Sequence, residues 1–82
     1  MKLLVRNLSR STSEDEIRRV FASYGQVQSC NLVLDKVTGK SKGFGFVEMP
    51  VNGEAKQAVK NLNGMELGGK NIRVKKAEEL ED

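Results

Sequence analysis

Histidine and tryptophan are absent from this 82-residue chain, and cysteine occurs once. Without histidine, the chain has no His-based zinc site and no Ser–His or Cys–His catalytic pair. A single cysteine excludes an intramolecular disulfide and a cysteine-rich metal site. The composition therefore predicts no metal and no other cofactor. We interpret Cys30 as a small buried apolar side chain in a reduced, cytoplasmic protein.

Long apolar runs are also absent. No run approaches the ~20 residues that a membrane-spanning helix needs. The apolar start of the chain ends at Arg6, short of the roughly 7–15 residues in the core of a signal sequence. We therefore expect no membrane segment. The length suits one small domain, with no room for a second.

Acidic residues are scarce until the C-terminus. All 14 Lys and Arg residues lie between Lys2 and Lys76, whereas four of the 11 acidic residues lie among the last five positions. We therefore divide the chain into a basic domain at residues 1–77 and an acidic C-terminal tail at residues 78–82. A basic domain fits a protein that binds polyanions, although the small net charge is equally explained by solubility.

Two segments repeat the same helical spacing of apolar residues. Apolar side chains recur at i, i+3, i+4 and i+7 in residues 17–24 and again in residues 55–62. The segment Ser13–Glu16 has the sequence of a capping box, and Asn52 stands where it can cap the second helix. We expect Gly25 to end the first helix as a left-handed C-terminal cap.

The remaining apolar segments have the composition of strands. We expect strands at residues 3–8, 26–34, 42–49 and 71–75, and a brief one at 65–67 before a Gly-Gly turn. Uneven alternation near Gln28-Ser29 indicates a bulge there. The order β-α-β-β-α-β predicts a ferredoxin-like α+β sandwich, in which both helices cover one face of a four-stranded antiparallel sheet. The other face is then open to water.

The strand at residues 42–49 indicates which residues occupy the open face. Side chains alternate along a strand, so one face is formed by Lys42, Phe44, Phe46 and Glu48. A charged residue at each end marks this face as exposed, which disfavours the alternative with both phenylalanines in the core. The glycines on the other face, Gly43 and Gly45, would let a helix approach closely. The same alternation adds to the open face Leu4, Arg6, Asn31, Arg73 and Lys75.

The segment Lys42–Met49 resembles the eight-residue ribonucleoprotein motif of the RNA recognition motif family. The segment Leu3–Leu8 resembles the six-residue partner of that motif, and the resemblance extends to about Ala77. A chain of this kind is similar to the small bacterial RNA-binding proteins with a single motif. The resemblance implies that Phe44 and Phe46 stack on bases or a sugar and that Lys42 contacts a phosphate.

One position departs from the family pattern. The hexamer position of Leu4 is usually aromatic, so this chain has an apolar side chain where a third ring is expected. Five other residues of the open face are candidates for RNA contact, although each is equally explained as ordinary solvated surface: Arg6, Asn31, Val33, Arg73 and Lys75.

These patterns predict a monomeric, non-catalytic protein that binds single-stranded RNA. Single-stranded DNA stays an alternative ligand, because stacking serves both nucleic acids. A protein-interaction module on the same sheet face is a second hypothesis, which the non-aromatic Leu4 favours. An enzyme on this fold is disfavoured, because adjacent Arg6 and Asn7 would lie on opposite faces of their strand.

Overall fold

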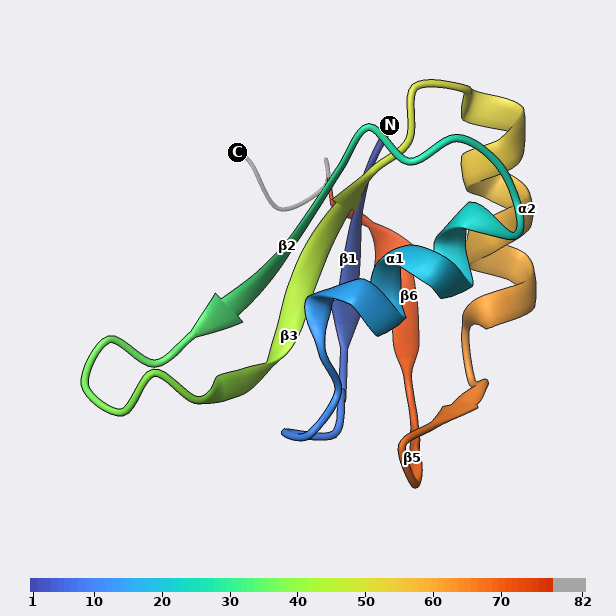
Figure 1. Ribbon diagram of the computed structural model, residues 1–82. Coiled ribbons are helices and arrows are strands. Elements are labelled where there is room, and N and C mark those ends of the chain that lie inside the picture. The colour runs from blue at the N-terminus through green and yellow to red at the C-terminus, as the bar shows by residue number, and fades with distance from the viewer. Residues whose placement is uncertain (78–82) are drawn as a thin grey trace.

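The computed structural model describes residues 1–77, and the predicted acidic tail at residues 78–82 lies outside the described residues. The expected order of helices and strands is confirmed (Figure 1), including the brief strand before the Gly-Gly turn, and the last expected strand is divided into two. The elements are β1 (Lys2–Arg6), α1 (Glu14–Ala22), β2 (Ser29–Leu34), β3 (Ser41–Glu48), α2 (Asn52–Leu62), β4 (Glu66–Leu67), β5 (Lys70–Asn71) and β6 (Arg73–Lys76).

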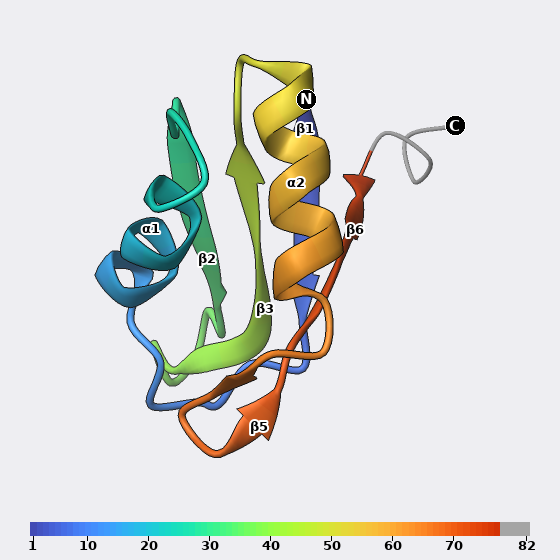
Figure 2. The same ribbon diagram turned by 90° about the vertical axis from the view of Figure 1, so that its right-hand side faces the viewer.

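The main sheet has the strand order β2-β3-β1-β6, and every neighbouring pair is antiparallel. Both helices lie on one face of this sheet, and the other face is uncovered (Figures 1 and 2). Strands β4 and β5 pair only with each other and form the hairpin before β6. The predicted ferredoxin-like α+β sandwich is therefore confirmed. None of the helices in residues 1–77 has the length and apolarity needed to cross a bilayer.

Local sequence signals account for both helices. Helix α1 begins with the predicted capping box: the Glu16 N–H donates to the Ser13 hydroxyl at 3.2 Å, and the Ser13 N–H donates to the Glu16 carboxylate at 3.1 Å. In α2, the N-cap is Val51, and no side chain caps the helix. The expected cap Asn52 is instead the first helical residue, so that prediction was wrong by one position.

The core lies between the helices and the inner face of the sheet. The apolar faces of both helices are buried there, as their spacing predicts. The largest fully buried side chains come from the strands, the helices and the segments that follow them: Phe21, Leu3, Leu8, Ile17, Met49, Leu62, Ile72, Val5 and Val47. The core therefore takes alternate residues of each strand and leaves the residues between them for the other face.

Gly25 has a different role from the one predicted. Helix α1 ends at Ala22, its C-cap Ser23 has an ordinary helical φ of −70°, and Gly25 is not in the left-handed region. The Glu54 carboxylate instead lies against Gly25 and accepts the Gln26 N–H at 3.0 Å. A Cβ at position 25 would overlap the Glu54 side chain, so the glycine provides space for a contact between the two helices' ends.

The glycines of β3 also contact the backbone and not a helix, contrary to the prediction. A Cβ on Gly45 would come within 2.5 Å of the Asn31 carbonyl oxygen on the neighbouring strand. Gly43 has a φ of +84°, which favours glycine. It lies in an irregularity where three residues of β3 oppose the single residue between Leu32 and Leu34. The irregularity therefore lies near the Leu34 end of β2, so the bulge expected near Gln28-Ser29 was wrong in position, and β2 begins only at Ser29.

Side chains cover the backbone at both edges of the sheet. On edge strand β2, the Leu32 N–H donates to the Glu14 carboxylate at 2.9 Å. On edge strand β6, the Val74 N–H donates to the Asn63 side-chain oxygen at 3.1 Å. Unpaired edge amides are templates for pairing with another chain. Glu14 and Asn63 therefore remove one such donor from each edge.

We expect Glu14→Ala to destabilise the domain by about 1 kcal/mol, because the Leu32 amide loses its acceptor. Hydrogen exchange of that amide should accelerate, and urea unfolding measures the free energy. Asp15→Ala is the matched control, because it removes the neighbouring first-turn carboxylate without touching β2. Equal exchange of the Leu32 amide in both variants would contradict this role of Glu14.

Candidate nucleic-acid interface

The predicted open-face residues form two rows across the sheet. The first row, from β2 to β6, consists of Asn31, Phe46, Leu4 and Lys75. In the second row, Arg6 on β1 lies directly opposite Arg73 on β6. All of these residues point away from the helices, because their strand neighbours are in the core. Phe44 on β3 lines one groove with Leu4 and Phe46, and Lys42 lines two neighbouring depressions with Phe44. We call this surface, with Phe44 and Lys42 included, the platform.

The two phenylalanines are partly exposed on the platform. Their ring centroids are 6.4 Å apart with an interplanar angle of 87°, an edge-to-face arrangement. The Lys2 ammonium lies 5.1 Å from the centre of the Phe46 ring, within cation–π range. Neither ring belongs to the buried core. The alternative with both phenylalanines in the core is therefore wrong.

Leu4 lies on the predicted face, but its neighbours cover it. Only 6% of its surface is exposed, because Phe46 and Lys75 stand directly opposite it on either side. It lines a shallow groove of about 340 Å³ together with Arg6, Phe44, Phe46 and Lys75. Leu4 is therefore part of an apolar groove between two partners and not a freely accessible side chain.

Positive charge is concentrated at one end of the platform. Arg6 and Arg73 are cross-strand neighbours and both are exposed. Like charges directly opposite each other on a sheet are destabilising without a counter-charge. This pair therefore favours an anion above the sheet.

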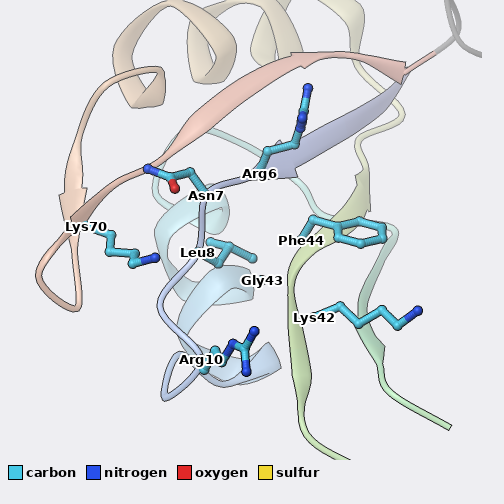
Figure 3. A pocket seen from close by; sticks show the side chains of 8 residues that line it. All are labelled: Arg6, Asn7, Leu8, Arg10, Lys42, Gly43, Phe44 and Lys70. Atoms are coloured by element: carbon cyan, nitrogen blue, oxygen red, sulfur yellow. The ribbon is translucent and has the colours of Figure 1, made fainter.

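A second depression, which we call the basic recess, adjoins the groove at this end (Figure 3). Its volume is about 260 Å³, and its lining consists of Arg6, Asn7, Leu8, Arg10, Lys42, Gly43, Phe44 and Lys70. Four of these side chains are cations and none is a carboxylate. Arg6 and Phe44 line both depressions, so the groove and the basic recess are continuous.

Two hydrogen bonds hold the backbone around the basic recess. Asn7 has a left-handed φ of 58°, and its side-chain amide donates to the Asn71 carbonyl at 2.8 Å. The next residue, Leu8, donates its N–H to the Gly43 carbonyl at 2.8 Å. The segment after β1 is thus fixed between the hairpin and β3.

Arg10 and Lys70 were not singled out from the sequence. Arg10 comes from the loop before α1, and Lys70 from the β4–β5 hairpin, so no shared periodicity links them. In Figure 3 both side chains extend toward Leu8 and Gly43. The only sequence signal was their positive charge, which they share with many surface residues.

The loop between β2 and β3 is organised by Asp35. Its carboxylate accepts the N–H groups of Val37 at 2.8 Å and Thr38 at 3.1 Å. The Thr38 bond, followed by the Val37 bond, lowers the pKa of the Asp35 carboxyl. The loop places Lys40 beside Arg10 and Lys42, where they line a further depression with Asp35.

Cys30 has the inert environment that was predicted. Its side chain is 3% exposed in the core. Burial, and then the negative charge of Glu14, raise the pKa of the Cys30 thiol. The thiol therefore stays protonated near neutral pH and is a poor nucleophile. Within residues 1–77, no group of three or more metal-ligating side chains comes together.

Comparison with known proteins gives a single family. The family model described as the RNA recognition motif matches residues 3–73. RbpB of Nostoc sp. is 42% identical over 82 residues, which is all of this chain and 80% of that protein. The crystal structure of RNA-binding protein PG1 is 36% identical, with a TM-score of 0.88, over 92% of this chain and 90% of that one. The structure of the Rna15 RRM with bound RNA (GU) is 27% identical, with a TM-score of 0.81, over 90% of this chain and 79% of that one.

We expect acid to break the hydrogen bonds that the Asp35 carboxylate accepts in the β2–β3 loop. Because the folded-state pKa of Asp35 is lowered, its loop hydrogen bonds are complete above the ordinary value of 3.8 and disappear as pH falls through the lower folded value. The Val37 and Thr38 amide resonances should therefore titrate with a midpoint below 3.8. Nuclear magnetic resonance measures this, and Asp35→Ala should abolish the titration. A midpoint at or above the ordinary value would contradict the hydrogen-bonded loop.

Proposed function

This chain belongs to the RNA recognition motif family and is a non-catalytic RNA-binding protein, and from that premise we propose that it binds single-stranded RNA on its platform. In this proposal, bases stack on Phe44 and Phe46, and phosphates meet the surrounding cations. The Rna15 RRM, with which this chain shares its fold and 27% identity, has been solved with bound RNA, which supports the proposal.

The observation that carries the proposal is the pair of partly exposed rings on a face that no helix covers. Exposed aromatic side chains are unfavourable in water unless a ligand covers them, and such surfaces mark interaction sites. An unpaired base has a flat π-face that stacks on a ring, whereas bases inside a duplex are already stacked on each other. This chemistry favours a single strand.

Polar residues of the platform suit the rest of a nucleotide. We assign phosphate contacts to Lys42 and Lys75 and to the opposed pair Arg6 and Arg73, whose mutual repulsion an anion relieves. Asn31 lies beside Phe46 in the first row and has both a donor and an acceptor for a base edge. Stacking then supplies affinity for any base, and these groups orient the strand.

A protein-interaction module on the same face is the less favoured function. The non-aromatic Leu4 suggested it, but this side chain is 6% exposed and offers a partner little apolar area. The exposed groups around the rings are mainly cations, whereas protein interfaces are depleted in charge at their centre. A titration with short RNA, with heparin as the nonspecific polyanion, distinguishes RNA stacking from general charge attraction.

We expect Phe44→Ala and Phe46→Ala each to weaken RNA binding by about 1–3 kcal/mol, the usual value of one base–aromatic stack. Isothermal titration calorimetry with a short single-stranded RNA measures the loss. Val51→Ala is the matched control, because it removes an exposed apolar side chain away from the platform. Normal RNA affinity in both Phe variants, together with early melting, would mean that the rings stabilise the fold only.

We expect Leu4→Phe to strengthen binding by about 1 kcal/mol, because a ring between Phe46 and Lys75 enlarges the stacking surface. The same calorimetric titration measures the gain, and thermal unfolding verifies that the variant is folded. An unchanged or lower affinity in the folded variant would show that no base lies above position 4.

A further inference from the structure

The basic recess adjoins the groove of the platform and shares the Phe44 ring with it. Its eight lining residues include four cations and no acid, and they come from the end of β1, the following loop, β3 and the hairpin. Folding thus brings like charges together from separate parts of the chain. The Asp35 carboxylate, which shares a neighbouring depression with Arg10, is an acid near this group and does not line the recess. The convergence of the four cations is therefore unfavourable in the unbound protein and becomes favourable when an anion enters.

We propose that the basic recess binds a phosphate group of the RNA strand beyond the stacked bases, with Arg10 and Lys70 as its ligands. This inference rests on the proposed function, because the strand must lie on the platform to reach the recess. It extends the binding site by residues outside the two ribonucleoprotein-like segments. The phosphate is either the diester of the next nucleotide or a monoester at the end of the strand.

Because the basic recess is continuous with the groove beside Phe44, its ligand is a phosphate of the same RNA strand that stacks on the platform. Phe44 and Arg6 line both depressions, so a nucleotide stacked on Phe44 has its neighbouring backbone at the recess. Figure 3 shows the Phe44 ring and the Arg6 side chain at one side of the recess, with Arg10 and Lys70 toward the other. An acidic protein segment would satisfy the charge but would not account for the shared aromatic ring.

The recess is also preorganised for a ligand of fixed position. The hydrogen bonds from Asn7 to Asn71 and from Leu8 to Gly43, both 2.8 Å long, hold its backbone. The glycine at position 68, with a φ of 63°, lets the hairpin that carries Lys70 lie against the loop around Ser9 and Thr12. A backbone that is already held loses less conformational entropy on binding than a mobile one.

The test compares oligonucleotides of increasing length. Full-length protein is titrated with single-stranded RNAs of two to six nucleotides that lack terminal phosphates, and with the dinucleotide carrying a 5′- or a 3′-phosphate. The double variant Arg10→Gln/Lys70→Gln is compared with Lys56→Gln/Lys60→Gln. The control loses the same charge from the exposed side of α2, which lies on the opposite face of the sheet. Thermal unfolding verifies that both double variants are folded.

We expect wild-type affinity to rise with length once the strand reaches the recess, and this rise to be smaller in Arg10→Gln/Lys70→Gln but intact in the control. For the longer RNAs, the slope of log affinity against log salt should become shallower by about 0.7 for each phosphate that the variant no longer neutralises. If affinity rises with length in RNAs without terminal phosphates, the bound group is the diester. If a terminal phosphate on the dinucleotide raises the affinity, the bound group is the monoester.

An equal loss of affinity in both double variants at every length would overturn the proposal, since only general attraction would then remain. The proposed function fails separately: Phe44→Ala and Phe46→Ala would then bind every RNA normally, whatever the recess variants do.

Discussion

Burial of one face of a four-stranded sheet under two helices is the constraint on which the rest of the structure depends. Once Leu3, Val5 and Val47 are in the core, the alternation of the strands forces Leu4 and Phe46 onto the opposite face. Helix packing does not cover that face, so its aromatic side chains remain available to a ligand. The packing that stabilises the domain therefore also creates its binding surface.

Positive charge is distributed unevenly over this surface and gathers at one end of the sheet. Arg6 and Arg73 oppose each other on neighbouring strands, and the basic recess brings Arg10, Lys42 and Lys70 to the same end of the sheet. At the edges of the sheet, backbone N–H groups are paired with side chains. The Glu14 carboxylate and the Asn63 side-chain oxygen each accept one of these donors. The uncovered face is thus prepared for a polyanion, while part of each edge is closed to another strand.

Sequence patterns succeeded mainly where the cause was local, with the cap of α2 displaced by one residue, and they failed where the cause was distant. The Ser13–Glu16 capping box and the two helical stripes depend on neighbouring residues, and the structure confirms them. Gly25 and Gly45 were recognised as special for the wrong reason. The first makes room for Glu54 and the second for the Asn31 carbonyl, and neither contact can be inferred from the surrounding sequence.

The sequence by itself determined the order of the elements, the fold class and the face on which Phe44 and Phe46 lie, because helical spacing and strand alternation follow from backbone geometry. Tertiary structure alone decided that Leu4 is covered by its cross-strand neighbours and that Arg10 and Lys70 join Arg6 and Lys42 around one recess. These outcomes depend on how a loop and a hairpin pack against the end of the sheet. That packing is set by contacts between segments far apart in the chain, such as Asn7 with Asn71.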